Sequence, residues 1–228
     1  AVVYVNMFGN PADYERLRKY CDTHHIPLIE DAAQSQGAMY GKIPSGAMGD
    51  VSVFSFDPMK NMPSFGGGGM VLTDSKEIRD TIVSLRRHGI SGKDKYGYNS
   101  LISEDHANQL LLLLKKFDRL QAMREKVCRR YMKNIPEVQI LCAGPNTKSS
   151  HHKLVILNDR RDDLKAYLET KGIQTKIHYL KTLDAEHLGQ YPNAEKICAK
   201  ALSLPMYPHL KMKEVDYICD RIKEFIHV

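Results

Sequence analysis

The chain has 228 residues, of which 43% are hydrophobic and 26% charged, a composition typical of a folded globular protein rather than a disordered one. The formal net charge of +6 is scattered along the chain, which argues against a nucleic-acid-binding protein, and the longest aliphatic run, 110–114, is too short to cross a membrane. Five cysteines without a Cys-x-x-Cys pair indicate neither zinc nor a disulfide framework, so we expect a metal-free cytoplasmic protein.

Along the first hundred residues, apolar strands alternate with amphipathic helices. Strands are predicted at 1–5, 26–30, 51–56 and 70–73. Helices are predicted at about 12–24 and 75–85, the second with an N-cap at Asp74 or Ser75. This alternation indicates an α/β layer with a mainly parallel sheet.

The rest of the chain has the pattern of a smaller α+β domain, joined to the first through a long helix predicted at about 103–134. Further strands are predicted near 138–141, 153–157 and 174–178, and further helices near 162–171, 194–201 and 213–226. We therefore predict two domains, 1–115 and 116–228.

A lysine in a loop rich in proline and glycine is the strongest local feature of the sequence. Lys60 follows the predicted strand 51–56, and four consecutive glycines occupy 66–69. In open α/β sheets, ligands bind at the carboxyl ends of the strands. A lysine held there and partly removed from water is a competent nucleophile toward a carbonyl group. The alternative is an ordinary solvated loop lysine.

An aspartate at the end of another predicted strand changes the balance between these alternatives. Asp31 directly follows the strand 26–30. In pyridoxal-phosphate enzymes a lysine forms the Schiff base, and a carboxylate keeps the pyridine nitrogen protonated so that the ring can accept electrons. Asp31 could instead cap a following helix. Together with Lys60 and the glycine run, the cofactor site is the better interpretation.

These motifs resemble the signature of the DegT/StrS sugar aminotransferases, fold-type-I pyridoxal-phosphate enzymes that aminate keto-sugars attached to a nucleotide. The similarity is ordered and covers essentially the whole chain. It is carried by 29–34, 37–38, 49–50, 54–56, 60–61, 68–70, 87–89, 97–99, His152, 177–179 and 202–205. The resemblance implies that 1–115 are the C-terminal portion of the cofactor-binding large domain and 116–228 the small domain.

For four matched residues the resemblance implies roles around the cofactor. Lys60 would carry pyridoxal phosphate and shuttle the proton. Asp31 would pair with the pyridine nitrogen, and Gln34 would lie near the ring hydroxyl. Ser55 would donate a hydrogen bond to the phosphate.

Two further residues are implied to reach a partner subunit or the substrate. Asn99 would contact the phosphate bound by the neighbouring subunit, which implies a homodimer with shared sites. His178 would face the sugar or the amine donor, although a core or surface histidine is as good an interpretation. The implied reaction transfers an amino group from an amino acid, with glutamate as the expected donor, to a nucleotide-linked keto-deoxysugar for amino-sugar and polysaccharide biosynthesis.

At several positions the chain departs from the family pattern. The family usually has an acidic residue at Gly67, an arginine at Leu101, a glutamine at His106 and a histidine at Gln36. Arginine and leucine are not interchangeable where a planar charged donor is needed.

The chain also starts well inside the family pattern. The absent portion would hold part of the phosphate cradle and the aromatic residue that stacks on the cofactor, so we expect weaker cofactor binding and an exposed apolar sheet face beside 1–5. Two alternatives stay open. One is a truncated or degenerate homologue that serves as a partner subunit, and the other is a sugar dehydratase, in which histidine replaces the lysine at Lys60.

Overall fold

The computed structural model describes residues 1–89, 96–183 and 189–227. The chain divides into two compact units, one formed by Ala1–Arg119 with Ala143–Ser150 and the other by Leu120–Cys142 with His151–Val228. The first unit thus includes a short segment that returns after the second unit has begun. The domain boundary placed between residues 115 and 116 stays a prediction.

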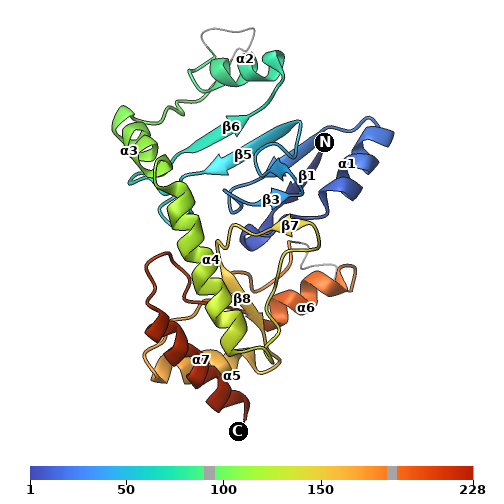
Figure 1. Ribbon diagram of the computed structural model, residues 1–228. Coiled ribbons are helices and arrows are strands. Elements are labelled where there is room, and N and C mark those ends of the chain that lie inside the picture. The colour runs from blue at the N-terminus through green and yellow to red at the C-terminus, as the bar shows by residue number, and fades with distance from the viewer. Residues whose placement is uncertain (90–95, 184–188, 228) are drawn as a thin grey trace. The chain divides into compact units, whose positions relative to one another are not determined.

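The first unit is built around a four-stranded sheet of order β1-β2-β5-β6 (Figure 1). The parallel strands are β1 (Val2–Val5), β2 (Leu28–Asp31) and β5 (Val51–Ser55). β6 (Gly69–Leu72) lies antiparallel to β5. The sequence predicted all four strands, and the mainly parallel character of the sheet is confirmed.

A second, antiparallel sheet in this unit was not predicted. It has the order β4-β3-β7, with β3 (Met39–Tyr40), β4 (Ile43–Pro44) and β7 (Thr147–Lys148). Each strand has only two residues, too few to produce an alternating pattern. β7 belongs to the returning segment, so this sheet joins parts of the chain that are about a hundred residues apart in sequence.

Helices α1 (Tyr14–Thr23) and α2 (Lys76–Leu85) begin at polar caps. The carboxylate of Asp13 accepts the backbone N–H of Arg16, and the hydroxyl of Ser75 accepts that of Ile78. These side chains satisfy donors that have no partner in the first helical turn.

The single long helix predicted at 103–134 is wrong, because two helices replace it. α3 (Glu104–Leu114) ends before α4 (Phe117–Asn134) begins. Between them the N–H of Lys116 donates to the carbonyl of Leu113, three residues back rather than four, which tightens the turn and interrupts the helix. No helix among the described residues is long and apolar enough to span a membrane.

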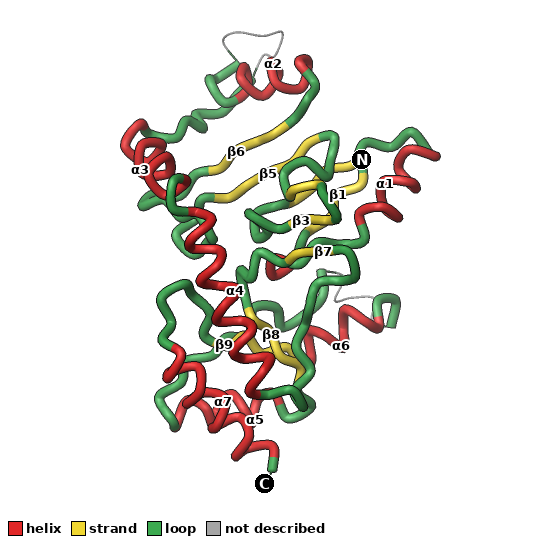
Figure 2. Tube along the Cα trace, in the orientation of Figure 1, coloured by secondary structure: helices red, strands yellow, loops and turns green. Residues whose placement is uncertain are grey.

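In the second unit, two paired strands pack among helices (Figure 2). Its remaining elements are β8 (Leu154–Leu157), α5 (Arg161–Thr170), α6 (Pro192–Lys200), β9 (Ala201–Leu204) and α7 (Met212–Ile226). β8 and β9 are antiparallel. The strands predicted at 138–141 and 174–178 are reduced to single bridges, Ile140 with Ile156 and Lys176 with Ser203. The helix predicted to reach residue 201 stops at Lys200, and β9 was not predicted.

One extensive apolar core holds the second unit together. Its helices contribute buried residues at helical spacing, as in Val215, Ile218, Cys219 and Ile222 of α7. The cluster consists of Val127, Cys128, Tyr131, Ile135, Val138, Leu154, Ile156, Leu164, Leu168, Ile173, Leu202, Leu204, Leu210, Val215, Ile218, Cys219, Ile222 and Phe225. All five cysteines of the chain are free thiols.

The two faces of β1 differ in the first unit. On one face Tyr4 packs with Cys21, Leu28 and Met48 in a small buried cluster. On the other face Val3 is 63% exposed and Val5 is 37% exposed. Alternation along the strand places these residues on opposite sides of the sheet. The apolar face expected beside 1–5 is therefore exposed.

Candidate functional site

Asp31 and Ser55 lie on the same face of the sheet, at the carboxyl ends of neighbouring parallel strands. Asp31 is the last residue of β2, and its register partner on β5 is Val53. Ser55, the last residue of β5, lies two positions further along and so shares the face of Val53. The fold thus brings together a carboxylate and a hydroxyl at the sheet edge where ligands of such folds bind.

One carboxylate oxygen of Asp31 holds the turn after β2. Its Oδ1 accepts the backbone N–H of Ala33 at 3.0 Å. The alternative that Asp31 caps a helix is wrong, because turns follow β2 and the next regular element is β3. No other hydrogen bond or ion pair to its side chain is found within the described residues, so the second oxygen can accept a ligand proton.

Lys60 lies in a tight turn after β5. Its backbone N–H donates to the carbonyl of Asp57 at 2.9 Å, and that residue's carboxylate accepts the N–H of Met59. The side chain of Lys60 is half-buried and forms no ion pair with any residue the structure describes. Its amine is therefore not neutralised by a carboxylate, which leaves it available to a ligand.

Ser55 keeps its hydroxyl proton available. Its Oγ accepts the backbone N–H of Asp57 at 3.3 Å, so the O–H can still donate to an anion. Its backbone carbonyl accepts the side-chain amide of Gln36 at 3.0 Å.

Gln34 is held by the segment that follows β1. The 3-10 turn η1 (Met7–Gly9) supplies the N–H of Phe8, which donates to Gln34 Oε1 at 2.8 Å. The backbone carbonyl of Gln34 accepts the hydroxyl of Ser150, in the returning segment, at 3.0 Å. Ser150 also accepts the Asn61 side-chain amide at 2.8 Å, so it joins the turn that carries Gln34 to the residue after Lys60.

Asn99 and His178 have contacts of their own. Asn99 is exposed and pairs through its backbone with Arg87, and no hydrogen bond among the described residues connects it to Asp31 or Lys60. His178 belongs to the second unit, where its Nδ1 is 2.8 Å from the hydroxyl of Ser203.

The ring of His178 is neutral at pH 7. Burial, with smaller contributions from Lys153 and Lys176, lowers its pKa from 6.5 to about 4. The histidine can therefore accept or donate a hydrogen bond without carrying charge.

The departures from the family pattern have local structural reasons at two positions. Gly67 has a φ of +81°, a conformation that side-chain-bearing residues rarely adopt. The ring of His106 fills the space beside Gly66, where an added Cβ would lie 2.1 Å from a ring carbon. Leu101 is 52% exposed and supplies no charged donor.

One buried carboxylate next to Asp31 in the chain, that of Glu30, was not predicted to have a role. Glu30 is fully buried and points to the face opposite Asp31. Its oxygens accept hydrogen bonds from Asn6 Nδ2 (2.8 Å), Ser45 Oγ (2.7 Å), Gly46 N (2.9 Å), Met48 N (3.1 Å) and Ser52 Oγ (2.7 Å). The signal was the adjacent pair of acidic residues at a strand end, because alternation sends one to each face.

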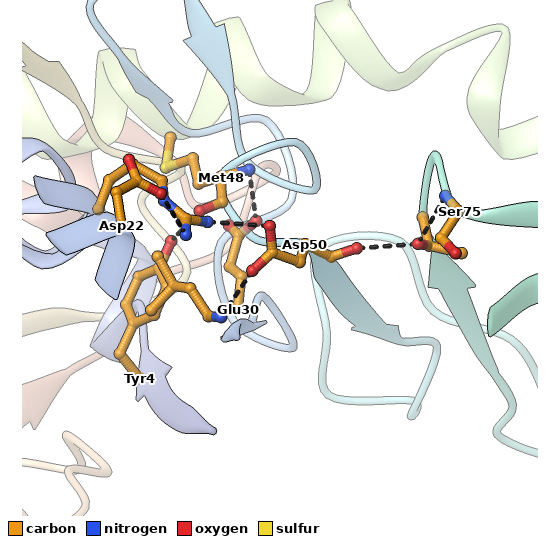
Figure 3. A network of polar contacts seen from close by, with 9 residues as sticks. Tyr4, Asp22, Glu30, Met48, Asp50 and Ser75 are labelled. Carbon is orange, nitrogen blue, oxygen red and sulfur yellow. Dashed lines mark hydrogen bonds and ion pairs between the residues drawn. The ribbon is translucent and has the colours of Figure 1, made fainter. Parts of the chain in front are cut away.

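Asp50 fixes the other end of β2 (Figure 3). Its Oδ2 accepts the N–H of Leu28 at 2.7 Å, and its Oδ1 accepts Arg18 Nη1 at 3.0 Å. These bonds lower the pKa of Asp50 below its usual value, the Leu28 bond most of all. Its carbonyl accepts the hydroxyl of Thr73 at 2.8 Å. Asp50 therefore ties α1, β2 and the end of β6 together.

The donors and acceptors at the sheet edge fit pyridoxal phosphate. Asp31 offers an oxygen to a protonated ring nitrogen, and Ser55 offers a proton to a phosphate. Lys60, which has no carboxylate partner in the described part of the chain, offers an amine to an aldehyde.

The sequence and the fold both match known proteins. The model of the DegT/DnrJ/EryC1/StrS aminotransferase family matches residues 1–223. The chain is 34% identical to a pleiotropic regulatory protein of Geobacillus stearothermophilus, with 99% of this chain and 65% of the relative covered. It is 32% identical to the dTDP-3-amino-3,4,6-trideoxy-alpha-D-glucose transaminase of Streptomyces venezuelae, with coverages of 99% and 63%.

The fold closely resembles the crystal structure of Streptomyces venezuelae DesV in complex with a ketimine intermediate. The TM-score is 0.93 at 31% identity, and the match covers 99% of this chain and 65% of that one. The fold class predicted from the sequence is confirmed by this likeness. The chain spans less than two thirds of the length of these relatives.

Proposed function

Because this chain belongs to the DegT/DnrJ/EryC1/StrS aminotransferase family, we propose that it transfers an amino group from an amino acid, with glutamate as the expected donor, to a keto-deoxysugar carried on a nucleotide. The observation that carries the proposal is the shared sheet face of Asp31 and Ser55, with Lys60 in the turn that follows.

Each residue at the sheet edge has a defined task in this proposal. Pyridoxal phosphate, the cofactor of the family, supplies an electron sink when it is bound. Asp31 accepts a hydrogen bond from the ring nitrogen and favours its protonated form. Ser55 donates to the phosphate. Lys60 would move the proton between Cα of the amino donor and the cofactor carbon, a general acid–base role.

The names of the relatives support a nucleotide-linked sugar as the acceptor. They include the dTDP-sugar transaminase and a GDP-perosamine synthase of Escherichia coli O157:H7, the latter 28% identical to this chain. Because the nucleotides differ among them, the acceptor is proposed only as a class. We further propose a cytoplasmic homodimer in which Asn99, exposed in this chain, reaches the cofactor phosphate of the partner, and in which His178 faces the sugar or amine donor.

A non-catalytic role is the second candidate. It is favoured by Gly67 and Leu101, which replace an acidic residue and an arginine in the pattern that the chain resembles. A relative named as a pleiotropic regulatory protein points the same way. The dehydratase alternative is disfavoured by Lys60, since histidine replaces the lysine in that branch.

Borohydride reduction of the cofactor-treated chain tests the proposal. We expect the intact mass to rise by one reduced cofactor and peptide mapping to place it on Lys60. The variant Lys60→Ala should lose the adduct and all turnover but keep its fold. Lys42→Ala, which removes an exposed lysine of the first unit, is the matched control and should keep both. An adduct of equal yield in Lys60→Ala would show that another lysine holds the cofactor, and no adduct in the wild type would favour the non-catalytic candidate.

The variant Asp31→Asn separates a catalytic role from a structural one. Its amide oxygen can still accept the Ala33 N–H, so the free energy of unfolding should hardly change. An amide cannot stabilise a protonated ring nitrogen by charge, so turnover should fall by about a hundredfold or more. Steady-state kinetics alongside urea unfolding would measure both. Unchanged turnover would show that Asp31 only holds the turn.

A further inference from the structure

Gln36 connects the two ends of the turn that carries Lys60. It lies after β2, and the residue is only 5% exposed. Its Nε2 donates to the carbonyl of Ser55 at 3.0 Å, and its Oε1 accepts the N–H of Met62 at 3.1 Å. Ser55 lies before Lys60 in the chain and Met62 lies after it. The side chain of Gln36 therefore links the two ends of the segment that contains the lysine.

We propose that Gln36 is a positioning residue for Lys60. Ser55 and Met62, which lie before and after the lysine, are fixed to each other and to the turn after β2, and this turn begins directly after Asp31. Lys60 is thereby held at a set place relative to the carboxylate. The catalytic consequence rests on the proposed function, whereas the positioning itself does not.

The side-chain amide is suited to this task because it uses one donor and one acceptor at once. A glutamate of the same shape would bring a carboxylate oxygen against the Ser55 carbonyl. A leucine would leave the Ser55 carbonyl and the Met62 N–H without the partner that now satisfies each of them. Unsatisfied polar groups in a buried place are costly, so the segment should loosen in either variant.

The test uses the full chain without cofactor and two variants, Gln36→Leu and Gln36→Glu. The control is Gln109→Leu, because Gln109 also accepts a backbone N–H of this loop, that of Phe65 at 3.0 Å, from α3. In Gln36→Leu we expect the Met62 amide to exchange its hydrogen about tenfold faster, whereas in Gln36→Glu a carboxylate oxygen can still accept that N–H and the exchange should change less. In both variants we also expect acetylation of Lys60, measured against exposed Lys42, to become about threefold faster. The control should change neither rate.

Kinetics then distinguish positioning from general damage. If the chain turns over, Gln36→Leu should lower kcat with little change in KM, because the substrate contacts are untouched. Unchanged Lys60 acetylation in both Gln36 variants would overturn the proposal, even if the Met62 amide exchanged faster. A wild-type chain that forms no cofactor adduct would refute the proposed function but would leave the acetylation result to decide the positioning role.

Discussion

The two units are stabilised in different ways. The second unit has a large apolar core to which helices and strands contribute alike. The first unit has a small apolar cluster, and in it the buried carboxylate of Glu30 accepts five hydrogen bonds. Apolar packing tolerates small shifts, whereas five hydrogen bonds to one carboxylate specify a geometry. The unit that carries Asp31 and Lys60 is thus the one in which strand ends are fixed by polar contacts.

Removing the charge of Glu30 is the strongest challenge to this contrast. Glu30→Gln places an amide N–H₂ group among hydrogen-bond donors, so at least two of them lose their acceptor. We expect the free energy of unfolding to fall by about 3–5 kcal/mol, as measured by urea denaturation followed by circular dichroism. Glu214→Gln is the matched control in the second unit, because within the described residues that carboxylate accepts only the N–H of exposed Lys211. A loss as small as that of the control would mean that the polar cluster does not stabilise the first unit.

A single methylene removed from the second unit should have a smaller effect. Ile222 on α7 is fully buried in the apolar core. Ile222→Val leaves a small cavity, and we expect a loss of about 1 kcal/mol in the same denaturation experiment. Val3→Ala on the exposed sheet face should cost much less. Equal losses of unfolding free energy in Ile222→Val and Val3→Ala would contradict the difference in burial between the two residues.

A pH dependence is expected in the second unit as well. The pKa of His178 is about 4 in the folded chain and about 6.5 when unfolded, so the unfolded state binds more protons between these values. Its contribution to stability is complete above pH 6.5 and is lost as the pH falls toward 4. His178→Asn should therefore lose less stability than the wild type between pH 7 and pH 5. The control His209→Asn, at an exposed histidine of the same unit, should follow the wild type.

Local pattern was enough to predict the main sheet and the place of the site residues. The strands that end at Asp31 and Ser55 are short apolar runs with clear ends, and parallel pairing brings such ends to one edge. The placement of Lys60 after the second of these strands followed from the same reasoning. The roles of these residues toward a cofactor stay predictions.

What could not be predicted depends on contacts between distant residues. The partners of Glu30 lie 15 to 24 residues away in sequence, and no local pattern marks them. β9 begins at Ala201, directly after α6 ends at Lys200, and neither residue is a glycine or proline. The sequence therefore has no local signal for the end of the helix at this point. The break at Lys116 interrupts an apolar pattern that continues through it.

The returning segment has a consequence for how the first unit folds while the chain is being made on the ribosome. The side chain of Asn61, next to Lys60, donates to the carbonyl of Ser150, which is translated 89 residues later. At about 5–20 residues per second, that interval is roughly 4–18 s. During it, β3 pairs with β4 but has no β7 on its other edge. The lysine loop of a nascent chain therefore stays incomplete until α4 has emerged, and chaperones have that interval in which to protect the open strand edge.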